Sequence, residues 1–256
     1  MPLIKELRKF LKQFAKDNGI TIITSIQIPY FADINYLDEL KIVELKQNGV
    51  GVKIENDFSA TYGKVDSLEK IINAFGVKHI DITRDTRIIY VEGITDYNYL
   101  TAFKKLKETK ENKKINVVFL PIHGLGKDNA EMNNKLKQLV QFREAIILTD
   151  SDDRATLFKK ASESNSLMKE KLIVFQLKEA DQSFKEIESL FSDNDKERYK
   201  EMIQNKSGSL SSLFKNNILK RELDEQTINN FNKLLDYLSD MVLTDNKNNN
   251  KENQNS

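Results

Sequence analysis

The stretch RIIYVEGITDYNYL, residues 87–100, decides how the rest of the chain is expected to fold. Four apolar residues at 88–91 form a short run that is typical of a buried strand. The run ends in a carboxylate, Glu92, and a second carboxylate, Asp96, follows about one helical turn later. In sheets of alternating strands and helices, ligands bind beyond the carboxyl ends of the strands. Glu92 and Asp96 are therefore expected to be either helix caps or metal ligands.

The same strand-then-helix pattern recurs after this stretch. Short apolar runs predict strands, and apolar residues at helical spacing predict the helices between them. The strands are expected at 87–91, 115–120, 145–149 and 171–176, and the helices near 96–108, 129–142 and 155–169. This alternation indicates an α/β fold with one parallel sheet and helices on both of its faces. The carboxyl ends of the strands should then meet at one edge.

Residues 1–57 predict a smaller piece that is incomplete as an independent core. Apolar residues at helical spacing predict a first helix that stops near residues 17–19. The run ITIITSI, residues 20–26, predicts a strand, and the turn residues at 48–49 predict a hairpin between two further strands.

Three other segments lie outside the expected sheet domain, residues 87–192. Residues 58–86 are interpreted as a linker that carries one helix. Residues 193–242 predict two or three helices. Residues 243–256 are rich in asparagine and have almost nothing to bury, so they are expected to form a disordered tail.

Composition excludes several classes of protein. The chain has 256 residues, a formal net charge of +1 and no cysteine. It therefore has no disulfide, no thiolate metal site and no global field that attracts nucleic acid or membrane. No stretch approaches the roughly 18 consecutive apolar residues of a membrane span, and the N-terminus is not a secretory signal. We expect a cytoplasmic protein that does not bind a membrane.

Acidic residues follow three of the predicted strands. Glu92 follows the first, Asp150 and Asp152 follow the third, and Glu186 and Glu188 lie beyond the fourth. Carboxylates two residues apart beyond a strand end can approach closely, and a hard divalent cation relieves their repulsion. Oxygen ligands, in a chain with no cysteine and two histidines, favour Mg²⁺ or Mn²⁺ over zinc.

An alternative interpretation assigns the acids to helix capping. Asp96 taken alone fits a first-turn helix acid, and Asp150 and Asp152 taken alone fit turn and N-cap positions. Either pair in isolation is more often structural than ligating. The metal interpretation depends on both pairs falling at the same edge of one sheet.

Three segments together resemble the Toprim domain, which is shared by topoisomerases, bacterial primases and the OLD (overcoming-lysogenization-defect) family nucleases. They are VEGITD after the first strand, the glycine-bearing loop PIHGLG after the second and ILTDSDD after the third, within about residues 85–190. The resemblance implies that Glu92, Asp150 and Asp152 hold divalent metal and carry catalysis.

The OLD branch of the family implies further site residues. The acid one turn after the Glu-Gly pair also contributes there, and Asp96 occupies that place. A later acidic pair in that branch corresponds to Glu186 and Glu188. Lys206 would be the catalytic cation that these nucleases carry near the scissile phosphate. Arg154, beside the acids, is either a contact for a DNA phosphate or a solvated surface charge.

The first residues resemble the last strands of the ATPase domain that precedes Toprim in OLD proteins. Where that family has a Thr-His-Ser-Pro switch, this chain reads Gln27-Ile28-Pro29. The chain also contains no G-x-x-x-x-G-K-[ST] loop to hold nucleotide phosphates. The resemblance therefore implies a truncated ATPase remnant, from a split or decayed gene, with no ATPase activity of its own.

The function implied by the resemblance is metal-dependent cleavage of DNA. One or two Mg²⁺ or Mn²⁺ ions would activate a water and stabilise the leaving oxygen. The expected partners are DNA, a second copy of the chain in a homodimer, and a separate ATPase subunit encoded upstream. The alternative is a catalytically silent remnant or protein-interaction module in which the acids persist without turnover.

Overall fold

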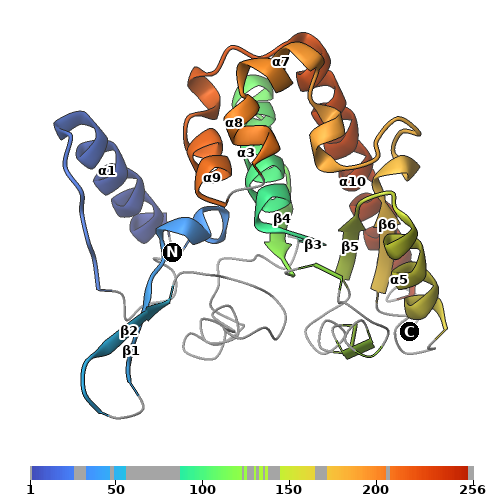
Figure 1. The fold of residues 1–256 in the computed structure, drawn as a ribbon, viewed down its shortest axis with the longest axis horizontal. Coiled ribbons are helices and arrows are strands. Elements are labelled where there is room, and N and C mark those ends of the chain that lie inside the picture. The colour runs from blue at the N-terminus through green and yellow to red at the C-terminus, as the bar shows by residue number, and fades with distance from the viewer. Residues whose placement is uncertain are drawn as a thin grey trace. The chain divides into compact units, whose positions relative to one another are not determined.

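A computed structural model of the 256-residue chain describes residues 2–25, 33–46, 49–55, 87–122, 124–125, 130, 133–134, 136–137, 145–164, 172–205 and 208–252 (Figure 1). Contacts divide the described chain into two units, one within residues 2–55 and the other within residues 87–252. The linker expected at 58–86 and the switch position at 27–29 lie outside the described residues.

The first unit contains a helix, a short 3-10 segment and a hairpin. They are α1 (Pro2–Asn18), η2 (Ile34–Glu39), β1 (Ile42–Leu45) and β2 (Val52–Glu55). Arg8 of α1 forms an ion pair with Asp33, with 2.8 Å between its guanidinium nitrogen and the carboxylate. The two strands pair in antiparallel register, which confirms the hairpin predicted around residues 48–49.

The prediction of a strand at residues 20–26 was wrong. Its described part, residues 20–25, has neither helical nor strand structure. Isoleucine and threonine favour strands mainly through the neighbours they pack against. In the described part of this unit the sheet pairs β1 with β2, and Ile23 is 92% exposed. No described strand lies beside residues 20–25, so their propensity alone did not produce a strand.

The second unit is built on a four-stranded parallel sheet. Its strands are β3 (Arg87–Val91), β4 (Val117–Pro121), β5 (Ala145–Thr149) and β6 (Leu172–Gln176). Their order is β4-β3-β5-β6, and each neighbouring pair is parallel. All of β4 and the last three residues of β3 are buried, as expected where both faces of a sheet are covered. The α/β prediction is confirmed at this level.

The strand order reverses at β3 and β5. Helix α3 (Ile94–Glu111) leads from β3 to β4 on one side, whereas α5 (Asp153–Glu163) leads from β5 to β6 on the other. Because parallel crossovers are right-handed, connections that run in opposite directions place their helices on opposite faces. The carboxyl ends of β3 and β5 therefore flank a topological switch point, where open α/β sheets bind ligands.

Two predicted helices differ from the observed ones in their extent. α5 ends at Glu163 rather than near 169, with Ser164 as its C-cap. The residues that follow Lys160 are rich in serine and asparagine, which favour caps and turns over helix interiors. Of the helix predicted at 129–142, residues 130, 133–134 and 136–137 are described and are helical.

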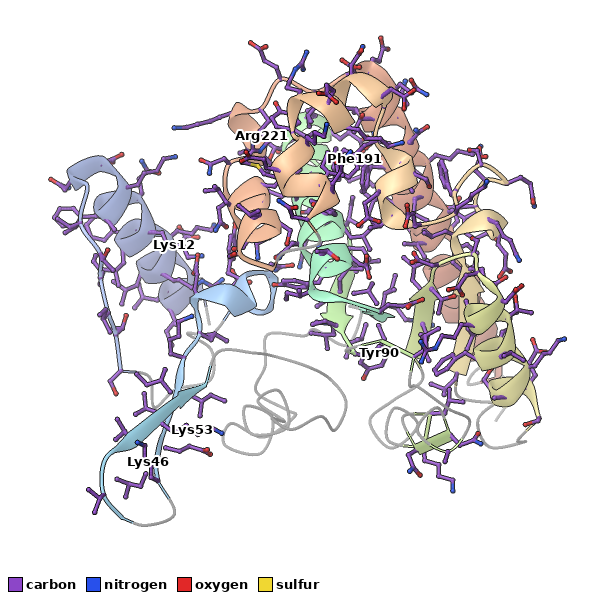
Figure 2. All side chains as sticks on the ribbon, viewed as in Figure 1. Lys12, Lys46, Lys53, Tyr90, Phe191 and Arg221 are labelled. Atoms are coloured by element: carbon purple, nitrogen blue, oxygen red, sulfur yellow. The ribbon has the colours of Figure 1, made fainter. Side chains whose placement is uncertain are left out.

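The C-terminal helices share a core with α3. They are α7 (Asp193–Arg198), α8 (Lys200–Gln204), α9 (Gly208–Asn216) and α10 (Glu225–Glu252). Phe191, labelled in Figure 2, meets the rings of Tyr99 from α3, Phe214 from α9 and Phe231 from α10 at centroid distances of 5.0–5.7 Å. Phe103 of α3 stacks on Phe231 at 3.6 Å. α3 is thus enclosed between the sheet and these helices.

The last helix is longer than the apolar pattern predicted. α10 continues as helix to Glu252, whereas the chain after residue 242 was expected to be a disordered tail. Its described buried residues include Phe231, Leu234, Leu235 and Leu238 in the first half of the helix. A helix already held by this packing can propagate at little further cost, since nucleation is the expensive step. No helix in the described residues is long and apolar enough to cross a membrane.

Candidate functional site

Glu92 and Asp150 lie at the switch point, each directly after its strand. Glu92 follows β3 and Asp150 follows β5, and these two strands are hydrogen-bonded neighbours. The backbone N–H of Asp150 donates to Oε1 of Glu92 over 3.0 Å. The two acids that end different strands are therefore joined directly at one edge of the sheet, as the strand pattern predicted.

Asp96 lies one turn into α3 and faces the same place. Its Oδ2 accepts the backbone N–H of Gly93 over 2.8 Å, so it closes the first turn of the helix. Although the residue keeps some exposed surface, its carboxyl group is enclosed. Burial, and then the charge of Asp150, raise the pKa of Asp96 well above its usual value.

Further carboxylates act on Asp96. The charges of Glu188 and Glu92 also raise its pKa, against the opposing effect of the Gly93 amide. Glu188 lies in the short helix η4 (Ile187–Leu190) and is buried. Its charge, together with that of Asp96, adds to the effect of burial in raising the pKa of Tyr99 on the next turn of α3. The charges that act on Asp96 thus come from the ends of β3 and β5 and from η4.

A small cavity lies beside three of these acids. Its volume of about 10 Å³ is close to the least that holds one water molecule. Three acids, Glu92, Asp96 and Asp150, line it together with Thr149, and the rest of its wall is apolar: Val91, Leu100, Leu148, Leu177 and Ile187. A single small polar species would therefore meet several carboxylates against an otherwise dry wall.

The other two predicted ligands lie at the surface, at the N-termini of helices. Asp152 is exposed, and its Oδ1 accepts the N–H of Ala155 over 2.7 Å as the N-cap of α5. Glu186 is exposed and is the N-cap residue of η4. The capping alternative therefore holds for one oxygen of Asp152, and Asp96 also closes a helix turn. A carboxylate has a second oxygen, so neither role excludes ligation.

The side chains do not form a finished coordination shell. In the part of the chain that the structure describes, no three acidic or histidine side chains converge closely enough to hold a metal ion. One oxygen of Glu92 and one of Asp96 are taken by backbone N–H groups. These bonds fix how each carboxylate is oriented toward the cavity.

The glycine-bearing loop after β4 contacts the site through its backbone. Gly124 has a φ of +73° and donates its N–H to the carbonyl oxygen of Glu92 over 2.6 Å. Residues with a Cβ rarely adopt this backbone conformation, which explains why a glycine stands at this position. Lys206, the predicted catalytic cation, lies outside the described residues. Arg154 is exposed in the first turn of α5.

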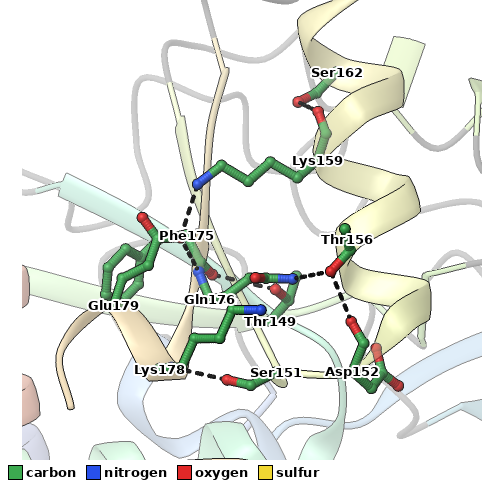
Figure 3. Close-up of polar contacts among 10 residues, drawn as sticks. All are labelled: Thr149, Ser151, Asp152, Thr156, Lys159, Ser162, Phe175, Gln176, Lys178 and Glu179. Atoms are coloured by element: carbon green, nitrogen blue, oxygen red, sulfur yellow. Dashed lines mark hydrogen bonds and ion pairs between the residues drawn. The ribbon is translucent and has the colours of Figure 1, made fainter. Parts of the chain in front are cut away.

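Sequence reasoning missed the residues that hold the acidic loop after β5. Ser151, between the two aspartates, bonds through both its backbone and its hydroxyl to the segment after β6. The buried side chain of Gln176, at the end of β6, donates to Thr156 in the first turn of α5 (Figure 3). A serine flanked by acids is visible in the sequence, but its partners are 27 to 34 residues away and carry no motif.

Comparisons with known proteins gave no match that bears on the site. No protein-family model matches the chain, and no curated protein matches it at a significant level. The residues at the switch point and their charges are therefore the evidence for function.

Proposed function

We propose that the second unit is a divalent-metal-dependent DNA endonuclease of the OLD-type Toprim class, which hydrolyses phosphodiester bonds. The observation that carries the proposal is the cavity at the switch point that Glu92, Asp96 and Asp150 line, with Glu92 bonded to the backbone N–H of Asp150. The four-stranded parallel α/β sheet supports the Toprim-like interpretation. Mg²⁺ or Mn²⁺ is the proposed ion.

The electrostatics of the cluster favour a cation. Burial, and then the charges of Asp150, Glu188 and Glu92, raise the pKa of Asp96, so its charged form is disfavoured where it lies. The cluster can relieve the repulsion by keeping a proton or by binding a cation. Oxygen-only donors beside a cavity the size of a single small ion match a hard divalent metal.

Each acid has a distinct part in this proposal. Glu92 and Asp150, fixed to adjacent strand ends, supply the rigid ligands, and Asp96 adds the ligand from α3. Asp152 would add a ligand through the oxygen that does not cap α5, and Glu188 with Glu186 would complete a second position. A bound divalent ion lowers the pKa of a water and stabilises the leaving oxygen of a phosphodiester.

The apolar lining of the cavity and the basic residues have different proposed roles. Leu148, Leu177 and the other apolar lining residues give the cavity a wall of low polarity, which strengthens the interaction of the carboxylates with a cation. Arg154 is exposed beside the N-cap Asp152, where it is proposed to contact a DNA phosphate. Lys206 is retained as the proposed catalytic cation.

The direct test is a plasmid-nicking assay with Mg²⁺, with Mn²⁺ and with EDTA. We expect nicking with either metal, none in EDTA, and loss of at least a hundredfold in Glu92→Gln, in line with removing a transition-state interaction. Glu197→Gln is the matched control, because Glu197 is a surface acid with a 78% exposed side chain on α7. Nicking that survives EDTA or Glu92→Gln, or no nicking at all, would refute the proposal.

A second candidate function is a protein-interaction module without turnover. One face of the first unit's hairpin favours it. Val43 pairs with Ile54 and Leu45 pairs with Val52 across the strands, and these four side chains are 52–77% exposed. The proposed occupant is the separate ATPase polypeptide. Co-expression with that polypeptide should give a complex that Leu45→Lys disrupts, and nicking unaffected by this substitution would separate the two roles.

A further inference from the structure

Ser151 makes three hydrogen bonds from the centre of the acidic loop. Its backbone N–H donates to the carbonyl oxygen of Lys185 over 2.7 Å. Its hydroxyl donates to the carbonyl oxygen of Phe184 over 2.9 Å and accepts the N–H of Lys178 over 2.8 Å. The side chain is half-buried, and Figure 3 shows its contact with Lys178.

These bonds connect the two loops that carry the acids. Asp150 and Asp152 flank Ser151, whereas residues 184 and 185 lead into η4 and Glu188. The connection continues toward that helix, because the N–H of Lys185 donates to Oγ of Ser189, and this hydroxyl donates to the Glu186 carbonyl. Ser151 is thus one link of a hydrogen-bonded path from the β5 loop to η4.

The other end of the acidic loop is held separately. Thr156 in α5 donates its hydroxyl to the carbonyl oxygen of Asp152 over 3.1 Å and accepts the side-chain amide of Gln176 over 3.1 Å. The N–H of Gln176 in turn donates to Glu179, which pairs with Lys159 at 2.8 Å. The start of α5 is therefore braced to β6 without Ser151, so removing the serine hydroxyl should release only the centre of the loop.

We propose that Ser151 is a positioning residue that sets the separation between Asp150 on the β5 loop and Glu188 on η4. The inference rests on the proposed metal-dependent function, since its consequence is the affinity of the acids for a divalent ion. A hydroxyl can donate and accept at once, so one atom fixes both Lys178 and Phe184. Groups that orient metal ligands without touching the metal typically contribute 10–100-fold to affinity.

The test compares Ser151→Ala, Ser151→Thr and the control Ser162→Ala. Ser162 is a buried serine of α5 whose hydroxyl donates to the Lys159 carbonyl, and it is not among the residues that line the acid cavity. Calorimetric titration of the full chain with Mn²⁺ should show about 10–100-fold weaker binding in Ser151→Ala. Ser151→Thr, which keeps the hydroxyl, should restore most of the affinity, and Ser162→Ala should bind as wild type does.

A second measurement, made without metal, keeps this proposal distinct from the nuclease proposal. Amide exchange of the apo chain should show the N–H of Lys178 protected in wild type and in Ser151→Thr but exposed in Ser151→Ala. A wild type that binds no Mn²⁺ refutes the proposed function, and the exchange result then decides the positioning role alone. Unchanged exchange at Lys178 in Ser151→Ala overturns that role. The positioning role is also overturned if Ser151→Ala lowers the melting temperature but leaves the Mn²⁺ affinity unchanged, because Ser151 would then have a purely structural role. If Ser151→Ala does not fold, Ser151→Cys replaces it, because a thiol donates and accepts only weakly.

Discussion

Replacing Asp150 and Asp152 separately should change the stability of the metal-free protein in different directions. Asp152 caps α5 by accepting the Ala155 N–H, so Asp152→Ala removes a cap. Asp150 instead lies against the acid cavity, and its charge is the strongest of those that raise the pKa of Asp96. Because the backbone N–H of Asp150 makes the bond to Glu92, Asp150→Asn leaves that bond in place.

The expected changes in stability are large enough to distinguish the two variants by thermal unfolding. Loss of the Asp152 cap should cost about 1 kcal/mol, or roughly 2–4 °C of melting temperature for a unit of this size. Asp150→Asn removes a repelling charge, so the metal-free protein should be as stable as wild type or slightly more stable. A metal at about a hundredfold excess over its Kd should stabilise wild type by about 2.7 kcal/mol, or roughly 5–11 °C. Asp150→Asn should lose most of that gain.

The assay is thermal unfolding at pH 7.5 of wild type and both variants, in EDTA and in Mn²⁺. Glu197→Gln serves as the control for a surface acid. The reasoning is refuted if Asp150→Asn lowers the EDTA melting temperature as much as Asp152→Ala does. It is equally refuted if Asp150→Asn keeps the full metal-induced shift.

Four further outcomes are expected. Asp96 has a raised pKa in the folded state, so without metal its contribution to stability is complete below the unfolded pKa of about 3.9. That contribution falls as pH rises toward the folded pKa, by at most about 1.4 kcal/mol per pH unit. In urea unfolding in EDTA from pH 4 to 8, the free energy of unfolding should therefore decline more steeply for wild type than for Asp96→Asn. Parallel curves of this free energy against pH would contradict the clustering of charges. Gly124→Ala should lose roughly 1–2 kcal/mol because φ is +73°, whereas Gly93→Ala, with φ of −132° and its nearest neighbouring atom at 3.5 Å, should lose less than Gly124→Ala in the same titration. Phe103→Ala should cost about 3–5 kcal/mol by denaturant unfolding, since its ring stacks on Phe231, and a loss below about 1 kcal/mol would show that the aromatic core is not shared. The purified chain should release no phosphate from ATP above background, with or without DNA, because it has no phosphate-binding loop.

The sheet was predictable because its strands are short apolar runs with local signals. The same signals placed Glu92 and Asp150 correctly, since a residue that ends a parallel strand must lie at the carboxyl edge. The adjacency of β3 and β5 was not predictable, because strand order depends on long-range packing. It is this order that joins Glu92 to Asp150.

Other features depended on partners that no local pattern reveals. Residues 20–25 have strand-forming composition but no strand structure. The connections of Ser151 reach the segment after β6, far along the chain. Asp96 and Asp152 were open between capping and ligation. The structure shows that each serves a helix terminus and that Asp96 also lines the acid cavity.

The shared aromatic core has a consequence for the order in which the protein matures. Strands β3 to β6 leave the ribosome before Phe214 and Phe231, whose rings cover α3. Until those residues emerge, α3 has an uncovered apolar side, and its first turn, which holds Asp96, lacks the support of the finished unit. The acidic site is therefore completed only late in synthesis.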